Sequence, residues 1–130
     1  MISHVFIGVS DFNRALNFYA RILPELGLTL KFNEAENAWA GWVGAAAPRP
    51  LFLIGKPFNG LAASPGNGQM VALLSPSRDV VDRVYRIALS LGASCEGPPG
   101  LRPHYHPDYY GSYFRDLDGN KICVCCHDPV

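Results

Sequence analysis

The sequence predicts an α+β fold made of two βαβββ repeats that form a curved mixed sheet around a cleft. Most apolar runs are short and bounded by Gly, Pro, Asn or Ser, which is typical of strands, and only two segments show helical spacing. The same order of elements occurs twice: Ser75 repeats Ser10 and Leu91-Gly92 repeats Leu26-Gly27, an offset of 65 residues in a chain of 130. We therefore expect one domain over 1–130, built from halves at about 1–55 and 69–130.

Both helices are predicted from apolar positions that share one face and from end signals. The first is expected over 11–23, where Ser10 or Asp11 can accept hydrogen bonds from the free N–H groups of the first turn, and Pro24 follows its end. The second is expected over 78–91, followed by Gly92, which suits the left-handed conformation after a helix.

The remaining apolar runs predict the strands. They span 2–8, 28–32, 38–43, 51–54, 69–74, a weakly defined run near Ser94, 109–115 and 121–127. Residues 118–120, Asp-Gly-Asn, predict the hairpin turn before the last strand. Residues 55–68 are expected to join the halves, and 96–111 to form a long irregular loop.

Composition narrows the classes of partner. The chain has 11 basic and 11 acidic residues, so no excess of positive charge favours nucleic acid or an anionic membrane. No apolar run approaches the about 20 residues of a membrane span, and no basic region precedes an apolar stretch at the N-terminus. We expect a cytoplasmic protein with a small-molecule ligand. In that reducing compartment its four cysteines are expected to be thiols.

Three cysteines lie in the last predicted strand. Alternation places Cys123, Cys125 and His127 on one face, whereas Cys126 points the other way and is expected in the core. Alternate residues sit about 7 Å apart, so three of them cannot converge on one tetrahedral metal. Cys123 is instead a candidate catalytic thiol, with His4 of the first strand as a possible base. Cys95, after the second helix, is expected to be a packing residue.

Three segments carry a resemblance to a known family. They are "HVFIGVSDFNRALNFY" (4–19), "MVALLSPSRDVVDRVYRIALSLGA" (70–93) and "YYGSYFRDLDGNKI" (109–122). Together they resemble the vicinal-oxygen-chelate superfamily of glyoxalases, bleomycin and fosfomycin resistance proteins and extradiol dioxygenases, in particular its small single-domain members. The resemblance implies a homodimer and a divalent metal on the inner face of the sheet, with ligands from the first, fourth, fifth and eighth strands.

The expected metal ligands are only partly present. His4 matches the first-strand ligand, but the fifth-strand position holds Met70, the eighth-strand position holds Cys123 and the fourth strand "LFLI" has no donor. Imidazole with two sulfurs favours soft ions, and zinc is the most compatible divalent ion because it can use His4 and Cys123 with waters. The alternative is no cofactor, with Met70 and Cys123 as apolar filler of a vacated site.

Candidate ligand-binding residues cluster in the predicted loop and on the first strand. Arg can form paired hydrogen bonds with a carboxylate, and Tyr and His offer flat rings with polar tips. A solvated loop stiffened by prolines is the alternative, and Trp39 and Trp42 are expected to pack in a core or a dimer interface. The substrate-binding candidates are Arg102, His106, Tyr109, Tyr110 and Phe6.

These observations leave three functional hypotheses. The preferred one is a glyoxalase-like or bleomycin-resistance-like protein with a degenerate metal site that binds a small organic ligand in the cleft. The alternative is a metal-dependent lyase, isomerase or dioxygenase, and the third is a cofactor-independent enzyme that uses Cys123. They share the expectation that His4 and Cys123 face one hollow.

Overall fold

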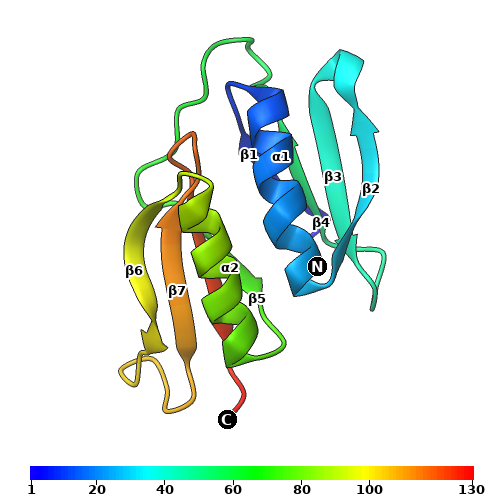
Figure 1. Cartoon of the computed structure of the whole chain (residues 1–130). Coiled ribbons are helices and arrows are strands. Elements are labelled where there is room, and N and C mark those ends of the chain that lie inside the picture. The colour runs from blue at the N-terminus through cyan, green and yellow to red at the C-terminus, as the bar shows by residue number, and fades with distance from the viewer. The chain divides into compact units, whose positions relative to one another are not determined.

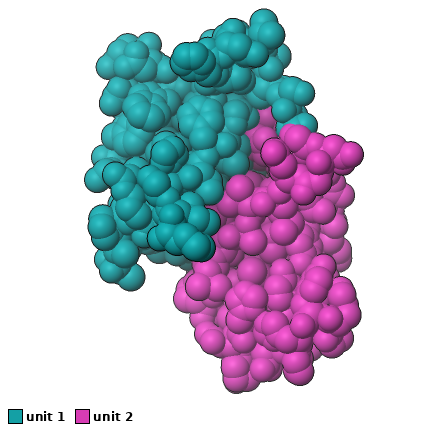
Figure 2. Space-filling model, turned by 180° about the vertical axis from the view of Figure 1, so that it is seen from behind, with its two compact units in different colours: residues 1–65 teal, residues 66–130 magenta.

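The computed structural model describes residues 1–130, which divide into two compact units, residues 1–65 and residues 66–130 (Figure 2). Each unit carries one four-stranded sheet and one α-helix. Neither α-helix, of 11 and 13 residues, has the length and apolar character needed to cross a membrane.

Unit 1 has the order strand, helix and three strands. Its elements are β1 (His4–Gly8), α1 (Phe12–Ile22), β2 (Leu28–Glu34), β3 (Trp39–Gly44) and β4 (Leu51–Gly55), with short 3-10 turns at Leu23–Leu26 and Ala35–Asn37. The sheet order is β1-β4-β3-β2; β1 runs parallel to β4 and the other pairs are antiparallel. The helix α1 lies across one face of this sheet (Figure 1).

Unit 2 repeats the same topology. Its elements are β5 (Val71–Leu74), α2 (Arg78–Ser90), β6 (Ser94–Leu101), β7 (Tyr110–Arg115) and β8 (Lys121–Cys126), in the sheet order β5-β8-β7-β6. Here β5 runs parallel to β8 and the other pairs are antiparallel. The predicted α+β fold with two βαβββ repeats is therefore confirmed.

The helix ends follow the predicted chemistry within a residue. Asp11 caps α1 by accepting a hydrogen bond from the Arg14 N–H at 3.1 Å, and Ser77 caps α2 through the Val80 N–H at 3.2 Å. Ser10, the other predicted cap of α1, instead accepts from the Ala63 N–H at 2.8 Å. Gly92 after α2 has φ 105°, a left-handed conformation that costs glycine little.

Both units pack their helix on apolar side chains of their own sheet. In unit 1 Tyr19 of α1 lies against Phe52 and Trp42, with ring centroids 5.2 and 6.5 Å apart. Trp39 lies on the opposite sheet face, where its ring contacts Phe32 and its indole N–H donates to Glu34 at 3.0 Å. In unit 2 the buried core includes Val81, Val84, Phe114, Ile122 and Cys126.

Two predicted boundaries differ from the structure. Strand β5 begins at Val71, so Met70 lies just before it and is 44% exposed. The expected loop over 96–111 is wrong in its first part, because β6 continues to Leu101 and only 102–109 connect it to β7. This strand lies at the edge of the sheet, where prolines are tolerated. Its pairing with β7 changes register twice, once just before Gly97 and once between Gly97 and Gly100.

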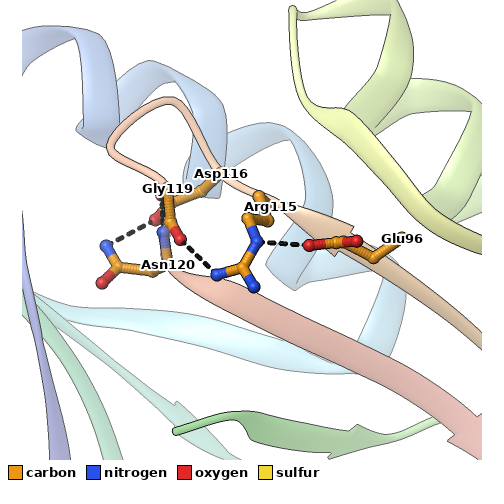
Figure 3. A network of polar contacts seen from close by, with 5 residues as sticks. All are labelled: Glu96, Arg115, Asp116, Gly119 and Asn120. Atoms are coloured by element: carbon orange, nitrogen blue, oxygen red, sulfur yellow. Dashed lines mark hydrogen bonds and ion pairs between the residues drawn. The ribbon is translucent and has the colours of Figure 1, made fainter. Parts of the chain in front are cut away.

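The predicted turn at 118–120 is held by the polar network of Figure 3. The Asp116 carboxylate accepts the backbone N–H of Asp118 and of Asn120, both at 2.9 Å, and the Asn120 side-chain amide at 3.0 Å. Gly119 has φ 91°, which favours glycine. Arg115 donates to the Gly119 carbonyl at 3.0 Å and pairs with Glu96. The turn thereby sets the β7–β8 register.

We expect Asp116→Ala to lower the free energy of unfolding by about 2–3 kcal/mol, because it removes a buried carboxylate and leaves part-buried N–H donors of the turn without their charged acceptor. Chemical denaturation followed by circular dichroism measures this change. Asp128→Ala, at an exposed position after β8, is the matched control and should change stability little. Equal effects of the two substitutions would contradict the role of the turn.

Candidate functional site

The two faces of the unit 2 sheet differ in chemistry. Tyr110 lies on the α2 side, since its hydroxyl donates to Asp82 of α2 at 2.7 Å and the Arg78 guanidinium lies 5.4 Å from its ring centroid. Cross-strand pairing joins Tyr110 to Cys126, so Cys126 shares that side. Alternation then places Tyr113, Cys123 and Cys125 on the opposite side, which we call the thiol face. Cys126 is thus a core residue, as predicted.

Two tyrosine hydroxyls meet one sulfur on the thiol face. The Tyr109 hydroxyl lies 2.8 Å from the Tyr113 hydroxyl and 3.5 Å from the Cys123 sulfur. Cross-strand pairing of Tyr113 with Cys123 brings their side chains together, and Tyr109 reaches them from the end of the 102–109 loop. Cys123 is fully buried. The sulfur is therefore in contact with polar groups although it is enclosed.

A second set of polar contacts continues from Cys123 along the strand. Cys125 is the next residue of β8 on this face, and its sulfur lies 3.6 Å from Nε2 of His127. Nδ1 of His127 lies 2.8 Å from Nε2 of His106, and the two rings stack. The Cys125, His127 and His106 contacts therefore lie beside the Cys123 cluster, and the Tyr109 ring contacts both imidazoles.

These contacts shift the acidity of the groups. The pKa of Cys123 falls to about 7, chiefly because the Cys125 thiol donates to its sulfur; the tyrosine hydroxyls and the Arg102 charge act in the same direction and burial opposes them. The pKa of Cys125 rises because its proton is shared with Cys123 and because it is buried. Burial and the hydrogen bond to Cys123 also raise the pKa of Tyr109. Cys123 is thus the thiol of this pair that ionises first.

An aromatic cluster surrounds Tyr109. Its ring centroid lies 4.9 Å from Tyr105, 5.7 Å from His106 and 5.2 Å from His127, and His104 stands 4.2 Å from Tyr105. Tyr105 is 61% exposed, so the cluster runs from the buried sulfur out to solvent. It offers a surface of ring faces and edges to a ligand.

Two cations flank Tyr113 on the same face. The Arg102 guanidinium lies 5.6 Å and the Lys121 ammonium 5.7 Å from its ring centroid. Arg102 is anchored by one hydrogen bond of 2.7 Å to the Pro98 carbonyl. Gly97 and Gly100 leave room for it, because a Cβ at either would lie 3.2 or 3.1 Å from its guanidinium nitrogens.

The predicted ligand-binding residues are only partly brought together. Arg102, His106 and Tyr109 all lie at the thiol face, whereas Tyr110 points to α2. Phe6 belongs to unit 1, where its half-exposed ring lies against Gly55. Sequence reasoning missed Tyr113, although strict alternation along 110–115 separates it from Tyr110.

The predicted metal ligands are divided between the two units. His4 is exposed in unit 1 and its Nδ1 lies 2.9 Å from the Ser3 hydroxyl, Met70 is exposed before β5, and Cys123 is buried in unit 2. Within neither unit do three His, Cys, Asp or Glu side chains come together as ligands. The residues therefore do not fit a resident metal inside either unit. The shared hollow of His4 and Cys123 stays a prediction.

A hollow of about 480 Å³ lies elsewhere in unit 1. It is lined by Ser10, Asp11, Phe12, Asn13, Ala35, Ala38 and Lys56. It contains none of the predicted site residues, and the side chain of Asp11 is already used as the α1 cap. The chemistry therefore points to the thiol face.

Comparisons with known proteins agree on one family. Residues 1–124 match the model of the Glyoxalase/Bleomycin resistance protein/Dioxygenase superfamily, and no curated protein matches the chain. A glyoxalase/bleomycin resistance protein from Albidiferax ferrireducens T118 is 33% identical, with 97% of this chain and 98% of that one covered and a TM-score of 0.84.

Two more distant structures share the fold. A family enzyme from Burkholderia phytofirmans PsJN is 16% identical over 97% of this chain and 98% of its own, with a TM-score of 0.71. TioX from Micromonospora sp. ML1 is 18% identical over 98% and 99%, with a TM-score of 0.65.

We expect the Cys123 thiol to ionise as the pH rises through about 7, below the about 8.5 of a free cysteine, so that near pH 7 about half of it is thiolate. The difference in ultraviolet thiolate absorbance between the protein and its Cys123→Ser variant follows this titration. Tyr109→Phe should move the midpoint upward because it removes a hydrogen-bond donor. A midpoint at or above that of free cysteine would contradict the arrangement.

Proposed function

The chain belongs to the Glyoxalase/Bleomycin resistance protein/Dioxygenase superfamily, and we propose that this member binds a small, flat organic anion at the thiol face without a resident metal. The single observation that carries the proposal is the aromatic cluster of Tyr105, Tyr109, His106 and His127, which the Tyr109 hydroxyl joins to Tyr113 and thus to the Arg102 guanidinium over the Tyr113 ring. This arrangement is suited to recognition rather than to coordination of a metal.

The aromatic side chains supply the apolar part of the proposed site. Ring centroids 4.2–5.7 Å apart form a continuous surface from Tyr105 to His127. A planar ligand can stack on this surface or meet ring edges, and each aromatic pair contributes about 0.5–1.5 kcal/mol beyond the area it buries. The exposed Tyr105 is the first ring that such a ligand would contact from solvent.

The charges supply the polar part. Arg102 and Lys121 both bring positive charge to the Tyr113 ring. The Glu96 carboxylate is already paired with Arg115. Arg102 uses one nitrogen for the Pro98 carbonyl, which leaves further N–H donors of its planar guanidinium for a carboxylate. A ligand with one negative group beside a flat ring system complements this pattern.

The alternative of a metal-dependent lyase, isomerase or dioxygenase draws support from family membership alone. Within each unit no three His, Cys, Asp or Glu side chains come together, whereas a protein zinc site needs at least three such ligands. The expectations of a homodimer and of a cytoplasmic location stay predictions.

We expect chelator-treated protein to bind planar aromatic carboxylates more tightly than the corresponding neutral amides, as measured by isothermal titration calorimetry after a thermal-shift screen. Arg102→Gln should weaken binding of the best carboxylate about 10- to 100-fold, because it removes a charge-assisted hydrogen bond. Arg86→Gln, on the exposed side of α2, is the matched control and should leave binding unchanged.

Three results would count against the proposal. They are a flat response across the ligand panel, equal affinity for carboxylate and amide, and binding or turnover that is found only after zinc, manganese, nickel or ferrous iron is added. The last result would favour the metal-dependent alternative instead.

A further inference from the structure

Two cations from different strands approach the Tyr113 ring. Arg102 directly follows β6 and its guanidinium lies 5.6 Å from the ring centroid, whereas Lys121 begins β8 and its ammonium lies 5.7 Å from it. The two charges are therefore no more than about 11 Å apart. Both side chains are half-buried, so each charge has lost part of its hydration and gains from an anionic partner.

The backbone around Arg102 fixes the position of the first cation. Its own N–H donates to the Tyr109 carbonyl at 2.8 Å, and its carbonyl accepts from the Tyr105 N–H at 3.0 Å. The guanidinium lies against the backbone of Gly97 and Gly100, where a Cβ would come within 3.2 and 3.1 Å of its nitrogens. Two glycines thus leave a place for this side chain on the edge strand.

Strand register fixes the position of the second cation. Lys121 is the first residue of β8 and lies opposite Arg115 of β7. Alternation places it on the same face of the sheet as Cys123, two residues further on. The ammonium is therefore brought to the thiol face by an inner strand and not by a loop.

Neither cation has a carboxylate partner. The Glu96 carboxylate is paired with Arg115, and the Asp108 carboxylate lies 3.9 Å from Arg78. The two cations beside the Tyr113 ring take part in no ion pair. The thiol face thus carries two positive charges that no side-chain carboxylate offsets.

We propose that the ligand of the thiol face is a planar aromatic dianion, with one carboxylate on Arg102 and a second on Lys121. This inference rests on the proposed function, because it names the charge of the same ligand. A single carboxylate uses the free N–H donors of Arg102 and leaves Lys121 without an anion. A flat ring that carries two carboxylates can contact the aromatic cluster and pair with both cations.

The test compares probes of one shape that differ in charge: terephthalate, its monoamide and its diamide, together with the matching naphthalene series. Calorimetric titrations use the intact, chelator-treated protein at pH 6. At this pH the Cys123 thiol, with a pKa of about 7, is largely neutral, whereas carboxyls with pKa values of about 4 are ionised. We expect a diacid to bind about tenfold more tightly than its monoamide, and the monoamide more tightly than the diamide.

Lys121→Gln identifies the second contact. It should lower the ratio of diacid affinity to monoamide affinity from about ten to about one, because the second carboxylate loses its charged partner. Lys31→Gln, at an exposed lysine of β2 in unit 1, is the matched control and should keep the ratio. Both variants should keep the thermal unfolding midpoint, since neither lysine is in a core.

The outcomes separate this inference from the proposed function. Equal affinity for diacid and monoamide, or an unchanged ratio in Lys121→Gln, would overturn the dianion while monoamide binding stronger than diamide binding still supports an anion site. Equal binding of all three probes, or no binding in either series, would overturn both.

Discussion

The first and last strands of each repeat pair in parallel, and this pairing governs how the other elements are placed. A parallel pair requires a crossover, which α1 and α2 provide, and it places β4 and β8 inside their sheets rather than at an edge. An inner strand with both faces covered needs apolar or small side chains. This is why Ile122, Val124 and the thiols of β8 are all buried.

The turn at Asp116–Asn120 determines which side chains of β7 and β8 lie opposite each other. It sets the register in which Tyr113 faces Cys123 and Phe114 faces Ile122. A slip of one residue would move the thiol pair to the α2 side and Cys126 to the thiol face. The family motif at this turn is thus explained by geometry: its carboxylate and glycine hold the strands that position the sulfur.

Cys123 is buried and its sulfur also contacts a polar group, which is an unusual combination. Enclosure normally favours the neutral thiol, but here donors from Cys125 and Tyr109 outweigh that effect. In the family position where the resemblance implies a metal ligand, the chain thus carries a sulfur satisfied by its own neighbours.

Several features of this protein can be predicted from its residues without coordinates. The repeat, the helices with their caps, the turn and the opposite orientations of Cys123 and Cys126 follow from periodicity and from local backbone chemistry, which act over a few residues. The strand β6 was missed in part because its glycines and prolines are typical of a loop, and only pairing with β7 makes them an edge strand.

The contacts between side chains distant in sequence become visible only in the folded chain. Tyr109 and Tyr110 are neighbours in sequence, yet one contacts Cys123 and the other contacts Asp82 of α2. His106 and His127 are distant in sequence and stack because the 102–109 loop lies beside the end of β8. Such contacts depend on strand register and on loop path, which arise from the packing of whole elements and leave no periodic signal in the residues themselves.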